Sequence, residues 1–77
     1  MTAGDANGAL DAAQSGLDVD SLNAGLWRLA MQAESKLGLR ESLANRYKRL
    51  CKLLDDQFGL DPQEATRSLY YELLGQR

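Results

Sequence analysis

Few side chains in this 77-residue chain could carry out chemistry, because it has no histidine and a single cysteine, Cys51. Without an imidazole base, Ser-His and Cys-His nucleophilic pairs are excluded. One cysteine without histidine also excludes the usual zinc and thiolate sites. Asp55 and Asp56 are adjacent, and adjacent helical residues point about 100° apart, so they cannot face each other as an acid and a base. The sequence therefore predicts a chain that is not an enzyme and has no catalytic, cofactor-binding or metal-binding residues.

The cysteine bears on the cellular compartment. Cys51 lies on an apolar helical stripe, where a cysteine is typically a small buried hydrophobe; a reactive thiol is the alternative. An unpaired cysteine fits a reducing cytoplasm. No apolar run approaches the ~18 residues of a membrane span, and the N-terminal MTAGDANGALDAAQSG lacks the basic and apolar regions of a signal peptide. We expect a cytoplasmic chain with no membrane or small-molecule partner.

Charge is unevenly distributed along the chain, although the net charge is only −2. Residues 1–27 carry four Asp and no Lys or Arg, which gives −4. Residues 28–52 carry seven basic residues against two Glu, which gives +5, and residues 53–77 carry five acids against two Arg, which gives −3. A basic middle between acidic ends argues against a general nucleic-acid binder.

The basic middle includes Arg46, Lys48, Arg49 and Lys52, which we expect to face away from the apolar stripe of their helix. Such a face is either simply solvated or a docking surface for an acidic protein patch or for nucleic acid. Aromatic interleaving, which favours single-stranded nucleic acid, is lacking. Tyr71 also falls off an apolar face, and exposed aromatic residues are enriched at interfaces. The candidate partner-binding residues are Arg46, Arg49, Lys52 and Tyr71.

These side chains would be positioned by a helical hairpin within residues 22–58. Two apolar stripes with the same spacing (offsets 0, 4, 7, 8, 11 and 15) flank Gly38, which predicts two amphipathic helices joined by a tight turn. The first stripe is Leu22, Leu26, Leu29, Ala30, Ala33 and Leu37, and the second is Leu43, Tyr47, Leu50, Cys51, Leu54 and Phe58.

Helix boundaries follow from the glycines and the capping residues. We expect helices at about residues 5–15, with Asp5 as N-cap and Gly16 as stop, and 22–37, capped by Asp20 or Ser21. The third helix would begin near Arg40 or Glu41 without a good cap and end at Phe58 before Gly59. The fourth, 62–74, would use Asp61 as N-cap, Pro62 as first residue and Glu64 as capping-box acid. No segment alternates with a period of two, so the fold is all-α, with about four helices.

Four bulky side chains are expected to hold the hairpin: Trp27, Tyr47, Leu50 and Phe58. Trp27 and Met31 lie to the side of the first stripe, which indicates a second neighbour for that helix. Trp27 is therefore either a filler between helices or an exposed binding anchor. Truncating a buried Phe58 to alanine would cost about 3–5 kcal/mol.

An internal echo indicates a repeat. Ala9, Ala13 and Gly16 precede Leu43, Tyr47 and Leu50 by 34 residues each, which is the period of tetratricopeptide helix-turn-helix repeats. The first and third helices would then be equivalent second halves of repeats. The sequence predicts tetratricopeptide-like antiparallel hairpins in one domain, residues 5–75, after a disordered segment, residues 1–4.

The ordered set of motifs resembles the bacterial transcriptional activator domain. The motifs are LWRLAM from Leu26, Leu37-Gly38, the spaced Leu43, Tyr47, Leu50 and Leu54, FGLDP from Phe58, and Thr66, Leu69-Tyr70 and Leu73-Leu74. The similarity spans roughly residues 4–74 and implies the C-terminal part of a tetratricopeptide-like domain of an actinobacterial-type regulator. Such domains usually follow a winged-helix DNA-binding domain and mediate protein contacts, including self-association.

The resemblance implies a non-catalytic protein-interaction module of a transcriptional regulator, with no cofactor. No winged helix is present in these residues, so contact with DNA is expected to be indirect, through a missing DNA-binding domain. Two alternatives remain: nucleic-acid contact through the basic face of the third helix, and a structural capping piece of a longer helical repeat protein.

Overall fold

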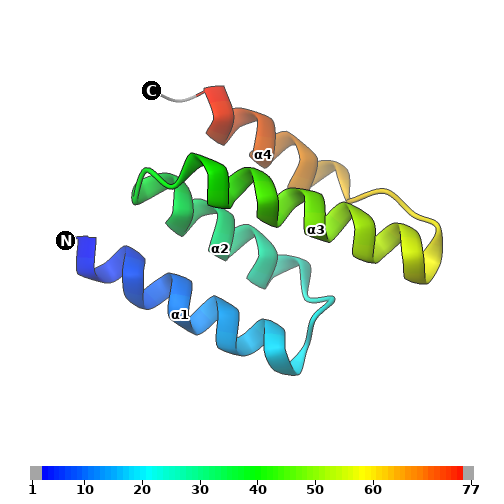
Figure 1. Ribbon diagram of the computed structural model, residues 1–77, viewed down its shortest axis with the longest axis horizontal. Helices are drawn as coiled ribbons and strands as arrows, with labels where there is room; N and C mark the ends of the chain where they lie inside the picture. Colours follow the sequence, from blue (N-terminus) through cyan, green and yellow to red (C-terminus); the bar gives the residue numbers. More distant parts are fainter. Residues whose placement is uncertain (1–2, 76–77) are drawn as a thin grey trace.

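The computed structural model describes residues 3–75, which form four helices with no strand among them (Figure 1). They are α1 (Ala3–Val19), α2 (Ala24–Lys36), α3 (Arg40–Phe58) and α4 (Glu64–Gly75). Consecutive helices run in opposite directions, so α1 and α3 point one way and α2 and α4 the other. The predicted all-α fold is confirmed, and the arrangement is consistent with tetratricopeptide-like hairpins.

Helix α2 is the centre of the fold, because α1, α3 and α4 all pack against it. Helices α1 and α3 lie on either side of α2 and run parallel to each other (Figure 1). That placement agrees with the 34-residue echo, in which these two helices are equivalent. Ala13 and its counterpart Tyr47 are both buried.

The interface of α1 with α2 is built from small residues, which let the two helices approach closely. The buried alanines on the two helices are Ala6, Ala13, Ala30 and Ala33. Gly16 lies so near Leu26 that an added Cβ would be 2.7 Å from its Cδ1 atom. Gly16 is therefore a packing residue inside α1, and the prediction that it stops the helix is wrong.

The other end of α1 also differs from the prediction. The helix begins at Ala3, so Asp5 lies within its first turn instead of capping it. Ala3 and Gly4 belong to this helix, whereas the rest of the predicted disordered segment, residues 1 and 2, lies outside the described residues.

Helices α2 and α4 begin later in the chain than predicted. Asn23 caps α2, because its side-chain oxygen accepts from the backbone N–H of Leu26 at 3.2 Å. The expected caps Asp20 and Ser21 lie in the preceding turn. α4 begins at Glu64 instead of Pro62, since the Gln63 carbonyl accepts the first helical hydrogen bonds, from Thr66 and Arg67.

The glycine stops around α3 are confirmed. Gly38 (φ 75°) and Gly59 (φ 64°) both adopt the left-handed conformation that glycine tolerates without strain. After α2, the N–H groups of Gly38 and Leu39 bond back to Ser35 and Glu34, which is a Schellman ending. α3 begins at Arg40 without a side-chain cap, as the sequence predicts.

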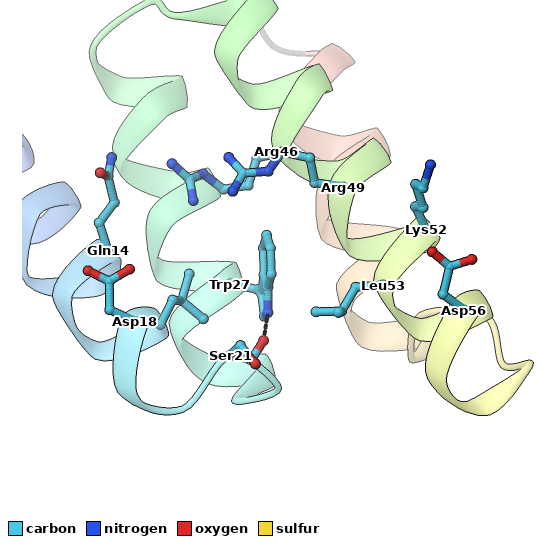
Figure 2. Close-up of a pocket in the computed structure, with 10 residues that line it drawn as sticks. Gln14, Asp18, Ser21, Trp27, Arg46, Arg49, Lys52, Leu53 and Asp56 are labelled. Atoms are coloured by element: carbon cyan, nitrogen blue, oxygen red, sulfur yellow. Dashed lines mark hydrogen bonds between the residues drawn. The ribbon is translucent and has the colours of Figure 1, made fainter.

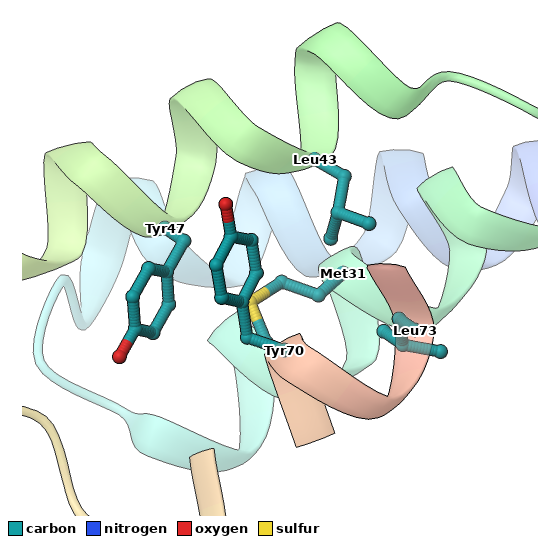
Figure 3. Close-up of a cluster of buried hydrophobic side chains, with 5 residues drawn as sticks. All are labelled: Met31, Leu43, Tyr47, Tyr70 and Leu73. Carbon is teal, nitrogen blue, oxygen red and sulfur yellow. The ribbon is translucent and has the colours of Figure 1, made fainter. Parts of the chain in front are cut away.

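The apolar core joins α2, α3 and α4 (Figure 3). Its buried members are Met31, Leu43, Tyr47, Tyr70 and Leu73. The rings of Tyr47 and Tyr70 stack almost in parallel, with centroids 3.9 Å apart, and so tie α3 to α4.

Two expectations about this core need correction. On α2, Leu22 and Leu29 are 39% and 37% exposed, whereas the off-stripe Trp27 and Met31 are buried. With three neighbours, α2 buries more than one stripe. Phe58 is 54% exposed, because the last turns of α3 extend beyond the other helices (Figure 1). Its predicted role in holding the hairpin is wrong.

Candidate functional site

A surface hollow lies between α1 and α3, above the N-terminal half of α2 (Figure 2). We call it the α1–α3 hollow. Its volume is about 420 Å³. Helices α1 and α3 supply its two sides, and the turn after α1 supplies Ser21. The lining residues are Gln14, Leu17, Asp18, Ser21, Trp27, Arg46, Arg49, Lys52, Leu53 and Asp56.

One side of the hollow is basic. Arg46, Arg49 and Lys52 follow one another at intervals of three residues on α3, so they lie on neighbouring turns of one face. The two arginine side chains reach from α3 over Trp27 towards α1 (Figure 2). Arg49 and Lys52 are exposed, and neither has an ion-pair partner among residues 3–75. The hollow thus brings together three of the four predicted partner-binding residues.

Arg46 differs from the other two because it is 8% exposed and forms a buried ion pair. Its Nε donates to Glu34 Oε1 at 2.7 Å, and the second carboxylate oxygen of Glu34 accepts from Ser42. The expectation that Arg46 faces solvent is wrong, because it follows Leu43 by three residues, on the face turned towards α2. Arg46 thus lines the hollow, while its Nε joins α3 to α2.

Trp27 forms the floor of the hollow. The side chain is 5% exposed, and its indole N–H donates to the backbone carbonyl of Ser21 at 2.7 Å. This bond fixes the ring against the turn between α1 and α2. Trp27 is therefore an inter-helix filler, as one of the two sequence interpretations had it, and it also lies at the bottom of the hollow. Leu17 and Leu53 add apolar walls on either side.

Two acids complete the lining. Asp18 belongs to α1 and faces the basic side, while Asp56 lies one turn beyond Lys52 on α3 (Figure 2). Both are exposed, and neither has an ion-pair partner in the part of the chain that the structure describes. The hollow therefore has a cationic side, an apolar floor and an acidic rim.

Tyr71 is separate from the hollow. It is 61% exposed on α4, and its ring leans against Tyr70 with centroids 5.4 Å apart. It does not line the hollow. The hollow and the surface around Tyr71 are therefore two separate candidate contact surfaces.

The family model for the bacterial transcriptional activator domain matches residues 1–74 of this chain. The chain belongs to the bacterial transcriptional activator domain family. No curated protein and no solved structure matches it. This is a family of regulatory domains and not a known class of enzymes. The resemblance inferred from the ordered motifs is thereby confirmed.

Possible chemistry in this activator domain is limited. Among residues 3–75, no group of three or more His, Cys, Asp or Glu could hold a metal ion. No helix within that range is long and apolar enough to cross a membrane. Cys51 is half-buried and has no disulfide. It lies beside Tyr47, whose pKa is raised to about 12 by burial and, to a lesser degree, by Cys51. Tyr47 therefore stays protonated at neutral pH.

Several residues of the hollow escaped sequence reasoning, namely Gln14, Leu17, Asp18 and Leu53, because membership in a hollow depends on how helices are placed. Glu34 could have been found. It stands four residues before Gly38, and Ser42 stands four after it. Positions at equal distance from a hairpin turn lie opposite each other, which predicts the contact between Glu34 and Ser42.

Proposed function

We propose that this activator domain is a non-catalytic protein-interaction module of a bacterial transcriptional regulator. It acts in the cytoplasm by presenting the side of α3 to another domain of the regulator, to a second copy or to another protein. Family membership supports the setting, and the α1–α3 hollow supports the mode of action.

The observation that carries the proposal is the unpaired basic side of the hollow above Trp27. Arg49 and Lys52 are exposed beside a hollow that has acids within it, yet neither forms an ion pair with any residue that the structure describes. Arginine and tryptophan are the residue types most enriched at protein-binding hot spots. A surface that places both around one concavity is typical of a protein contact.

Direct contact with nucleic acid is less favoured by the same surface. Asp18 and Asp56 line the hollow with the basic residues, and a phosphate backbone would be repelled by them. The stacked aromatic pair, Tyr47 and Tyr70, is buried and offers no platform for bases.

A two-hybrid screen with this chain as bait tests the proposal. We expect an identified protein, or the chain itself, whose binding is lost in Arg49→Glu or in Tyr71→Ala and kept in Lys48→Glu. Lys48 is a matched control, since it is an exposed cation on the same helix outside the hollow.

Titration with duplex DNA at low and moderate salt tests the alternative. Phosphate contacts weaken steeply with salt because counterions are released on binding. Salt-sensitive DNA binding that Arg49→Glu removes, together with no surface-dependent protein partner, would contradict the proposal.

A further inference from the structure

We infer that the α1–α3 hollow binds an amphipathic segment of a partner protein that presents an apolar side chain flanked by carboxylates. This inference rests on the proposed function and deepens it, because it names the place and the chemistry of the contact. The apolar side chain lies on Trp27, and the carboxylates lie on the α3 side.

The cationic side sets the charge of the occupant. Arg46 uses its Nε for Glu34, and its terminal guanidinium nitrogens form no hydrogen bond with the residues that the structure describes. Arg49 lies one turn further along α3 and has no ion-pair partner there either. Two guanidinium groups on neighbouring turns match one or two carboxylates, which they bind through several parallel hydrogen bonds.

The floor sets the apolar part. Trp27, Leu17 and Leu53 line the hollow between the charged groups. The hydrogen bond from the indole to Ser21 holds the ring in place, so a ligand gains apolar contact without first ordering the floor. An apolar side chain there also excludes water from the guanidinium groups, which strengthens their attraction for carboxylates.

The acidic rim limits how much negative charge the occupant can carry. Asp18 on α1 faces the basic side of α3 across the hollow. A uniformly acidic chain, or a nucleic-acid strand, would place charge against Asp18 and against Asp56. A segment with acids on one side and neutral or basic residues on the other suits the basic side on α3 and Asp18 on α1.

The openness of the hollow favours a protein segment over a small ligand. Small-molecule sites usually bury 70–90% or more of their ligand. Here six of the lining residues have polar side chains that are exposed on the surface: Gln14, Asp18, Ser21, Arg49, Lys52 and Asp56. A segment lying across the surface needs only to lower one side chain and its neighbours into such a hollow.

The probe is a short helical peptide with one leucine, glutamates one turn away on one side, and lysines on the other. It is titrated into the ¹⁵N-labelled chain. Trp27 is the single tryptophan, so its indole N–H signal and its fluorescence report directly on the floor. We expect both to shift, with dissociation constants no weaker than about 1 mM, and the shifts to fade as salt screens the charges.

Matched variants fix the site. Arg49→Glu and Lys52→Glu should each weaken the peptide roughly tenfold, whereas Lys48→Glu should leave its affinity unchanged. Replacing the glutamates of the peptide by glutamine, or its leucine by serine, should weaken binding to a similar degree. Equal loss in Lys48→Glu and Arg49→Glu would mean general attraction to a basic helix and would overturn the inference.

Other outcomes separate this inference from the function on which it rests. If a partner from the screen shifts only signals around Tyr71, and the peptide shifts none, the module still binds protein and the inference is wrong. If concentration-dependent sedimentation shows self-association that Arg49→Glu abolishes, the occupant is a second copy and not a separate partner. If neither peptide nor protein binds, both proposals fail.

Discussion

Glu34 and Arg46 illustrate how much a single pair of residues constrains this small domain. Both side chains are buried, with exposed fractions of 0% and 9%. Bringing two charges out of water is costly, and their attraction repays the cost only while both are present. Removing Arg46 alone would leave the Glu34 carboxylate buried with Ser42 as its remaining partner.

We therefore predict that Arg46→Ala destabilises the fold by about 3–5 kcal/mol. The double variant Glu34→Leu/Arg46→Met should recover most of that loss, since it replaces the pair by apolar side chains of similar size. Urea unfolding measures both. Arg49→Ala is the control and should change stability by no more than about 0.5 kcal/mol. A double variant as unstable as Arg46→Ala would contradict the interpretation.

Tyr47 gives the fold a dependence on alkaline pH. Its pKa is about 12 in the fold against an ordinary value of 10.0, because burial disfavours the phenolate and Cys51 adds to the effect. Below pH 10 the tyrosine is protonated in both states. Between pH 10 and pH 12 the unfolded chain loses the proton first, so the free energy of unfolding falls as pH rises.

Urea unfolding across that interval checks this, with Tyr47→Phe as the test variant. The variant lacks the titrating group, so its free energy of unfolding should fall less than that of the wild type over this interval. The difference between the two falls should be roughly 3 kcal/mol at most. Tyr71→Phe, at an exposed position, should keep the wild-type slope. If the free energy of unfolding depended on pH equally in the wild type and in Tyr47→Phe, the pKa of Tyr47 would not be raised by folding.

At the scale of elements, two glycines in α1 separate helix propensity from packing. Gly8 has open space where a Cβ would be, whereas at Gly16 the Cβ would lie 2.7 Å from Leu26. Alanine in a helix interior is favoured over glycine by about 0.5–1 kcal/mol. Gly8→Ala should therefore raise the thermal midpoint. Gly16→Ala should raise it less or lower it, because Leu26 must move. Equal gains at the two sites would mean that α1 does not approach α2 this closely.

The ends of α3 differ in a testable way. Leu43 is 1% exposed and Phe58 is 54% exposed. Leu43→Ala should cost about 2–5 kcal/mol, while Phe58→Ala should cost less than about 1 kcal/mol. Thermal unfolding of the two variants measures the contrast. A loss in Phe58→Ala that matches Leu43→Ala would show that the last turn of α3 is packed.

The same elements show what the sequence could predict. Local signals placed the turn at Gly38 and the end of α3 at Gly59, because both depend on a conformation that glycine adopts easily. The local signals misplaced the start of α4, because Asp61 and Pro62 have the residue types of an N-cap and a first helical residue. The helix begins instead at Glu64, with the nearby Gln63 and Thr66 side chains bonded to Arg28. Such tertiary contacts are invisible in local spacing.

At the scale of the whole molecule, burial depends on how many neighbours each helix has. The spacing of the apolar residues predicts one buried face on α2, but α2 has three neighbours. Trp27 and Met31 were predicted to face a second neighbour, and they are buried. Arg46 was misjudged because charge suggested solvent, while its position on α3 placed it against Glu34. The hollow itself required the relative placement of α1 and α3.

Three large apolar side chains of α3, the following loop and α4 are exposed. Phe58, Leu60 and Tyr71 are each more than half exposed. In a stack of helical hairpins, the next unit would cover such positions, since each repeat buries its apolar face only against its neighbours. The α1–α3 hollow is a different surface, and its mixed charge suits a partner and not a repeat.

The most direct test of the account is to map where an identified partner binds. Nuclear magnetic resonance of the labelled chain, with the partner recovered by the two-hybrid screen, gives that map. We predict shifts of the Trp27 indole N–H and of the amides of Arg49 and Lys52, and loss of those shifts in Arg49→Glu but not in Lys48→Glu. Shifts confined to α4, or an unchanged Trp27 signal at saturation, would contradict it.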